Sequence, residues 1–130
     1  MKVTELMIGD WVSYNGHPVF VEALNKSNGY AIEKDMISIK LNDDTCLGIN
    51  AERLEPLLLT DEIMKKNGFV CETWMPYWYI PYCHNLPYIE IFNNTEFVKD
   101  ADEGFIIHIQ YVHELQHLLK LFKIEKEIVL

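Results

Sequence analysis

The chain has 130 residues, a net charge of −9 at pH 7, and a composition in which 49% of the residues are hydrophobic. This length suits one domain, or two very small units that share a core, and the composition is globular rather than disordered. The charge argues against sequence-independent nucleic-acid binding, because phosphate contacts need a basic surface and Arg53 is the only arginine. The same charge is compatible with an acidic inhibitor or DNA-mimic protein.

No apolar run approaches the roughly 20 residues that a membrane-spanning helix needs. The first five residues also lack the apolar stretch of a signal peptide. We therefore expect a cytoplasmic protein that makes no membrane contact. The three cysteines are odd in number and lack C-x-x-C spacing, so we expect free thiols rather than disulfides or a cysteine-rich zinc site.

The first half of the chain, residues 1–58, predicts short strands separated by turns. Asn15-Gly16 is the strongest hairpin signal, because both residue types tolerate a positive φ. One helical turn at 50–53 is expected before the last strand. Five short strands with this turn predict an N-terminal SH3-like small β-barrel. The expected strands are 8–14, 18–24, 30–33, 36–41 (in clean period-two alternation) and 54–59.

The second half, residues 59–130, predicts an α+β subdomain in which two helices pack on an antiparallel strand layer. The first helix is expected at 60–67, where Thr60 is a suitable N-cap and Gly68 fits the position just past the end. A second helix is expected at 111–122. The expected strands are 74–82, 88–92, 104–110 and a short final strand at 124–130. The whole chain is thus expected to have an α+β fold.

A dense aromatic run lies in this second half and is interrupted by Pro76 and Pro81. The prolines exclude a helix interior and a central strand. The aromatic side chains either pack alternately on the terminal helix or form a stacking platform for a ligand or a partner. Because both faces of such a strand carry aromatics, one face must contact something other than its own core. The candidate partner or self-association surface consists of Trp74, Tyr77, Trp78, Tyr79 and Tyr82.

The sequence His113-Glu114-Leu115-Gln116-His117 matches H-E-x-x-H, the zinc-peptidase signature. In such a site two histidines bind zinc and the glutamate acts on the bound water, which would make the chain a small zinc metallohydrolase. The helix phase argues against this: at about 100° per residue the apolar side chains share one arc, and both histidines project opposite it. We favour a solvated helix face and assign no catalytic residue. If the motif does bind zinc, Glu114 is the candidate catalytic residue.

A third ligand is also hard to find, although a catalytic zinc needs three from the protein. Downstream, Glu125 and Glu127 follow so closely that the chain would have to reverse sharply to reach the site. Upstream, His108 lies close in sequence on the polar face of the expected strand 104–110. No third ligand is favoured, so we expect no cofactor, with zinc as the alternative. The other upstream candidates are His84, Cys83, Asp100 and Asp102.

Four segments of the chain resemble a family of short proteins without an assigned activity from gut anaerobic bacteria, often encoded near prophage or mobile-element genes. The segments are ELMIGDWV at 5–12, EPLLLT at 55–60, NGF at 67–69 and YVHELQ at 111–116. The resemblance implies a bacterial or phage origin and a compact cytoplasmic protein. It implies no activity and no site residue. We therefore expect a non-enzymatic accessory or interaction protein that binds an unknown protein partner or itself.

Overall fold

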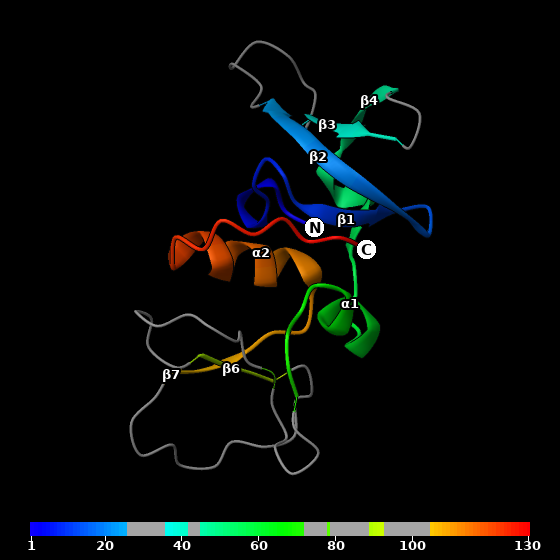
Figure 1. The fold of residues 1–130 in the computed structure, drawn as a ribbon. Helices are drawn as coiled ribbons and strands as arrows, with labels where there is room; N and C mark the ends of the chain where they lie inside the picture. The colour runs from blue at the N-terminus through cyan, green and yellow to red at the C-terminus, as the bar shows by residue number, and fades with distance from the viewer. Residues whose placement is uncertain (26–35, 42–44, 72–77, 79–88, 93–104) are drawn as a thin grey trace. The chain divides into compact units, whose positions relative to one another are not determined.

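The computed structural model describes residues 1–25, 36–41, 45–71, 78, 89–92 and 105–130. This part of the chain has an α+β fold with one five-stranded antiparallel sheet that is not closed, a pair of parallel strands and two α-helices (Figure 1). The chain divides into two compact units, Met1–Leu57 and Leu58–Leu130. The expected boundary, after residue 58, lies one residue away.

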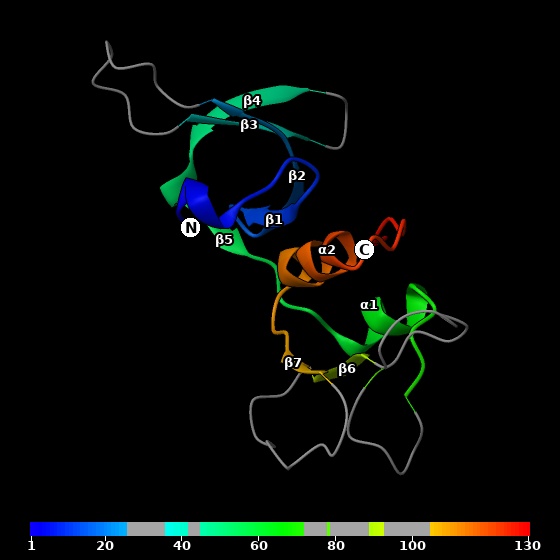
Figure 2. The ribbon, with the colours of Figure 1, turned by 90° about the vertical axis from the view of Figure 1, so that its left-hand side faces the viewer.

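The first unit contains the five-stranded sheet, in which each strand pairs with its neighbour in sequence until the chain returns to pair β5 with β1. The strand order is therefore β4-β3-β2-β1-β5, with β4 and β5 at the edges (Figure 2). A 3-10 turn, Val3–Glu5, precedes β1, and a second one, Ala51–Arg53, lies between β4 and β5, where a helical turn was expected. The strands are β1 Trp11–Tyr14, β2 His17–Asn25, β3 Met36–Lys40, β4 Cys46–Asn50 and β5 Leu54–Pro56.

The β1–β2 hairpin confirms the turn predicted at Asn15-Gly16. Tyr14 and His17 are paired across it, so the connection has two residues. Asn15 has φ 52° and Gly16 has φ 78°. Positive φ at both central positions gives the turn a twist that matches the flanking strands, which is why Asn-Gly is favoured there.

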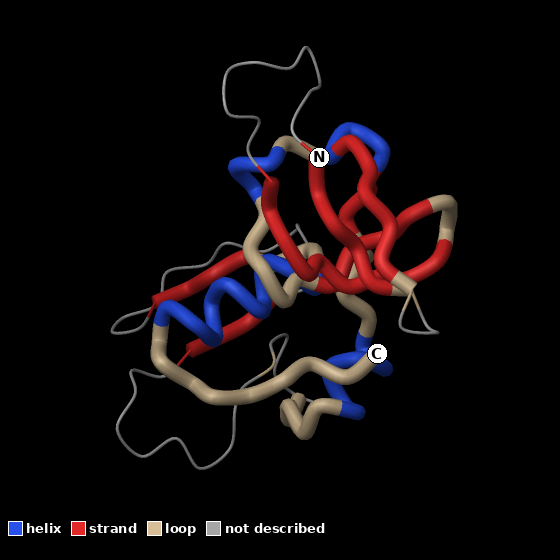
Figure 3. The backbone as a smooth tube through the Cα atoms, turned by 90° about the horizontal axis from the view of Figure 1, so that it is seen from above, coloured by secondary structure: helices blue, strands red, loops and turns tan. Residues whose placement is uncertain are grey.

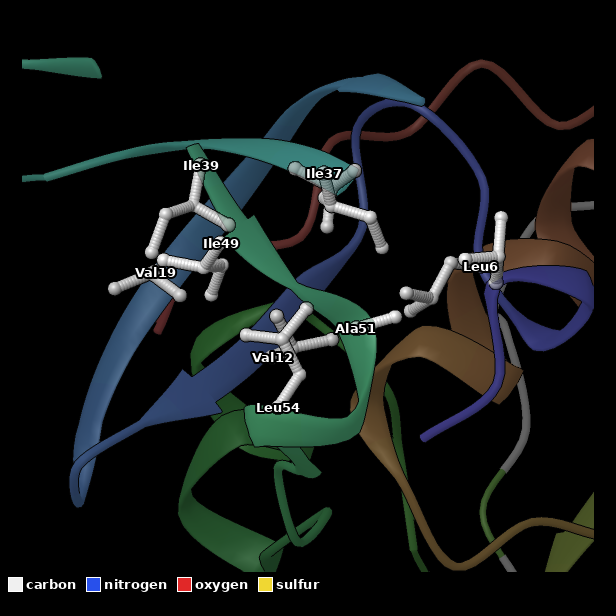
Figure 4. Packing of buried hydrophobic residues seen from close by; sticks show 10 residues of the cluster. Leu6, Val12, Val19, Ile37, Ile39, Ile49, Ala51 and Leu54 are labelled. Atoms are coloured by element: carbon white, nitrogen blue, oxygen red, sulfur yellow. The ribbon is translucent and has the colours of Figure 1, made fainter. Parts of the chain in front are cut away.

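The core of the first unit lies on one face of this sheet (Figure 4). In β3, Ile37 and Ile39 are fully buried, whereas Met36, Ser38 and Lys40 are half-buried, which confirms the predicted alternation. Aliphatic side chains from the other strands and the 3-10 turns pack against these two isoleucines. They are Val3, Leu6, Val12, Val19, Val21, Ile49, Ala51 and Leu54.

The sequence interpretation missed β4. This strand pairs with β3 over five residues, with Gly48 opposite Ser38 and Leu47 opposite Ile39. It was missed because Gly48 interrupts the apolar pattern and has low strand propensity, so only the pairing with β3 defines the strand. The strand expected at 30–33 lies outside the described residues, and the last strand is shorter than expected, Leu54–Pro56.

The second unit begins with helix α1, Asp61–Lys66, which confirms the first predicted helix. The Thr60 hydroxyl accepts a hydrogen bond from the Ile63 N–H at 3.3 Å, as expected of an N-cap. Gly68 has φ 74°, the left-handed conformation typical of a residue just past a helix end. The second predicted helix is also confirmed, as α2, Val112–Leu121.

The strand layer of the second unit was predicted to be antiparallel, and this prediction is wrong for the described strands. β6, Ile89–Phe92, and β7, Phe105–His108, pair in parallel. Parallel neighbours need a crossover of about a dozen residues, and residues 93–104 are available for it here. Sequence alternation reports which residues share a face but carries no information on strand direction.

The predicted final strand at 124–130 is also wrong, because this segment is irregular (Figure 3). The side chain of Asn67, only 5% exposed, takes the place of a neighbouring strand. Its amide donates to the Val129 carbonyl at 2.7 Å and to the Ile63 carbonyl at 2.8 Å, and its oxygen accepts from the Val129 N–H at 2.9 Å. Ile128, the residue before Val129, is buried.

Candidate functional site

The His-Glu-Leu-Gln-His motif lies at the beginning of α2, where Glu114 accepts two backbone hydrogen bonds. Tyr111 is the N-cap, with an extended backbone, so Glu114 occupies the third helical position. Its Oε2 atom accepts hydrogen bonds from the backbone N–H groups of Gln110 at 2.8 Å and Tyr111 at 3.0 Å. This is the glutamate half of a capping box. The carboxylate therefore fixes the direction in which the chain enters the helix.

His113 is buried, with 7% of its surface exposed, so the expectation that both histidines face solvent is wrong for this residue. His117 is half-buried. At about 100° per residue, the buried side chains of α2 cover roughly 220° of the helix circumference rather than the expected 120° or so. The buried arc is wider than expected because His113 is buried in addition to the apolar side chains. The buried residues are Val112, His113, Leu115, Leu118 and Leu119.

The rings around His113 form a short stack along the helix. The Tyr111 and His113 rings are nearly parallel, with centroids 5.9 Å apart and planes at 15°. The His113 and His117 rings meet edge to face, with centroids 5.7 Å apart. The Nδ1 atom of His113 is buried without a hydrogen bond in the described part of the chain, although the residue makes other contacts. The two histidine rings are close to each other, but a metal ion bound by both would still need further donors.

Within the described residues, no three His, Cys, Asp or Glu side chains lie together in a way that could hold a metal ion. Glu125 and Glu127, the downstream candidates, are exposed. His108 ends β7, and its side chain lies outside the description, as do Cys83, His84, Asp100 and Asp102. The described donors therefore do not fit a catalytic zinc site, which needs three protein ligands and an open position.

The aromatic run is described at one residue only, Trp78, which is 5% exposed. A side chain buried to this extent presents little surface of its own, and the role of the aromatic run in binding a partner stays a prediction. Burial of Trp78 is compatible with the other interpretation of the run, in which its aromatic side chains pack alternately on the terminal helix. Trp74, Tyr77, Tyr79 and Tyr82 lie outside the described residues.

An open pocket of about 330 Å³ lies at the tip of the β1–β2 hairpin. The Arg53 guanidinium lies over the Tyr14 ring at 5.1 Å from its centroid. This geometry is a cation–π contact, which holds the arginine against the first unit. Among the described residues, the lining offers one phenol and one imidazole but neither a carboxylate nor a thiol. The lining residues are Tyr14, Asn15, His17, Pro18, Val19 and Leu41.

The outer edge of β4 is a feature that the sequence interpretation did not anticipate. β4 carries no charged residue and no proline, and its first three residues are exposed. The Cys46 thiol donates a hydrogen bond to Glu22 Oε2 at 2.8 Å, so a carboxylate from β2 reaches this edge strand. Glu22 lies where the register between β2 and β3 shifts, between Val21 and Ala23. This edge is recognised from the pairing of β4 with β3, which sequence periodicity does not predict.

Comparisons with family models, with curated proteins and with solved structures found no match to this chain. Among the described residues, no helix is both long enough and apolar enough to cross a lipid bilayer.

Proposed function

We propose that this chain is a non-enzymatic accessory or interaction protein of a bacterial or mobile-element system. The observation that carries the proposal is the position of Glu114, whose carboxylate receives two backbone N–H groups at the start of α2. A glutamate that serves a zinc-bound water has to direct its carboxylate at the metal. Here the same oxygen holds the N-terminal end of a helix.

The capping role also has an energetic basis. A carboxylate in the first turn interacts favourably with the helix dipole, and each charge-assisted hydrogen bond is stronger than a neutral one. The Tyr111 N–H is partly buried, so it would be left without a partner if Glu114 turned toward a metal. The motif is therefore better explained as a helix N-terminus than as a catalytic site.

We also propose that the first unit is an SH3-like small barrel. The strand order β4-β3-β2-β1-β5 supports this, because it is a five-stranded meander whose last strand returns to the first. The 3-10 turn Ala51–Arg53 between β4 and β5 supports it further. Small barrels of this kind present loops and strand edges to other molecules, which agrees with an interaction protein.

A small zinc metallohydrolase is the alternative, and the contact between the His113 and His117 rings is the observation in its favour. It would use both histidines as ligands, His108 as a possible third donor, and Glu114 as base. This role conflicts with the hydrogen bonds that Glu114 makes to the backbone.

Zinc content separates the two functions. The protein, purified without a histidine tag, is dialysed against zinc and analysed for bound metal, next to His117→Ala and the control Lys120→Ala on the same helix. We expect zinc far below one equivalent in all three proteins. Stoichiometric zinc that is lost in His117→Ala and kept in Lys120→Ala would contradict the interaction protein and support the hydrolase.

A further inference from the structure

The two edges of the five-stranded sheet differ in how they are protected. Edge strands invite pairing with other chains, and proteins usually block them with short length, proline or charge. β5 has all three, because it spans only three residues and contains Glu55 and Pro56. β4 spans five residues, Cys46–Asn50, and has neither charge nor proline. Of the two edges of the described sheet, β4 is thus the one that lacks these features and suits a further strand.

The hydrogen-bond pattern shows which groups β4 directs outward. The Leu41 N–H donates to the Thr45 carbonyl at 2.9 Å, which makes this a hydrogen-bonded pair of the β3–β4 hairpin. Such pairs alternate in an antiparallel ladder, so Leu47 and Ile49 bond to β3. The N–H and C=O of Gly48, the residue between them, therefore point away from β3 at the outer edge of the described sheet.

The side chains on β4 define what an added strand would meet. On the core face, Leu47 lies opposite the fully buried Ile39 yet is itself 37% exposed, so the apolar core continues to the edge. On the other face, Cys46 carries the carboxylate of Glu22 through its thiol. An added strand would thus have an apolar surface on one face, and on the other the Glu22 carboxylate at Cys46, with Lys40 of β3 on the same face.

We propose that the edge of β4 binds an extended segment of a partner protein in which apolar and basic side chains alternate. The proposal rests on the interaction function argued above and names the surface and the chemistry of the partner. Main-chain hydrogen bonds to Gly48 provide affinity, and the alternate side chains provide specificity, as in other cases of β-strand addition. An apolar residue covers Leu47, and a basic residue on the opposite face approaches Glu22.

Charge selects a partner protein over a second copy of this chain. The net charge of −9 means that two copies repel each other, whereas a basic segment is attracted. The sequence before β4 is also acidic, with Asp43 and Asp44, whereas Glu52 after it is followed by Arg53. Lys40, which pairs with Cys46, is the one cation among the strand residues paired with β4.

The first test is hydrogen exchange at the Gly48 amide, followed by NMR with a short synthetic peptide that alternates lysine and valine. In the free protein we expect fast exchange at Gly48 and slow exchange at Ile39, which lies inside the sheet. The peptide should slow exchange at Gly48, and an otherwise identical peptide with glutamate in place of lysine should not. Protection of Gly48 in the dilute free protein, or equal effects of the two peptides, would overturn the proposal.

The second test uses paired variants. Leu47→Lys adds the charge that blocks natural edge strands, and Leu121→Lys makes the same change on α2, where the leucine is 74% exposed. We expect Leu47→Lys to weaken binding of the lysine–valine peptide by about tenfold or more and Leu121→Lys to leave it unchanged. Glu22→Gln should also weaken binding of this peptide, and more than the control Glu62→Gln does.

These outcomes also separate this inference from the proposed function. Undiminished peptide binding by Leu47→Lys would overturn the edge as the binding surface, without bearing on zinc content. A dimer that forms at high protein concentration and protects Gly48 would replace the partner segment with a second copy of the chain. Absence of any binding by the lysine–valine peptide would overturn the proposed chemistry of the segment.

Discussion

Substitution of Glu114 by alanine removes both hydrogen bonds that its side chain accepts from the backbone at the start of α2. The Gln110 N–H is exposed, so water can replace the carboxylate there at little cost. The Tyr111 N–H is partly buried, and its bond contributes more. A lost cap typically costs about 1 kcal/mol, so we expect Glu114→Ala to lower the free energy of unfolding by about 1–2 kcal/mol.

Chemical denaturation followed by circular dichroism measures this loss. Glu114→Gln should fall between alanine and the parent, because the amide oxygen still accepts a hydrogen bond but carries no charge. Glu125→Ala is the matched control: Glu125 is an exposed glutamate beyond the end of the same helix, where removal should change stability by less than about 0.5 kcal/mol. Equal stability of Glu114→Ala and Glu125→Ala would refute the capping role and return Glu114 to the candidates for catalysis.

Three further substitutions test the fold. Asn67→Ala should cost about 2–3 kcal/mol, since it leaves partly buried backbone groups of Val129 without partners; the Val129 amide should then exchange faster, and unchanged exchange would contradict the pairing. Gly16→Ala should cost about 1 kcal/mol in denaturation, purely from its φ of 78°, because an added Cβ would meet no atom within 4 Å. Trp78→Ala should lower the free energy of unfolding by about 3–5 kcal/mol in calorimetry, as expected for a buried aromatic; unchanged stability would contradict a core role and favour Trp78 as a contact residue.

The elements that sequence alone predicts well are those set by residues close together in the chain. The hairpin at Asn15-Gly16 depends only on two residues that accept positive φ. Helix α1 begins after the N-cap Thr60 and ends before Gly68, so the residues that set its ends lie within a turn of it. The alternation of Ile37 and Ile39 follows from the geometry of any strand with one buried face.

The elements that sequence misses depend on partners far away in the chain. Gly48 belongs to a strand only because β3 lies beside it. β6 and β7 pair in parallel, and side-chain alternation is the same in both strand directions, so the sequence pattern does not predict it. The final segment resembles a strand in its apolar residues, yet Asn67 supplies the hydrogen bonds that a strand would need.

The candidate site was predicted less well than the fold. The phase of α2 correctly placed the leucines together, but it treated the helix as covered on one side only, and His113 proved to be buried. Phase gives the direction of a side chain and not the depth of protein around it. The role of Glu114 could have been recognised from the sequence, because a glutamate three residues after the N-cap is a capping signal.

The start of α2 offers a criterion for other chains that carry His-Glu-x-x-His by coincidence or by descent. Because α2 begins one residue before the motif, its glutamate falls at the third helical position, within reach of unsatisfied amides. Had the helix begun two turns earlier, every nearby amide would already be bonded within it, and the carboxylate would have nothing in the backbone to hold. The distance from the helix start to the motif therefore separates a chain that uses its glutamate for architecture from one that keeps it available for chemistry.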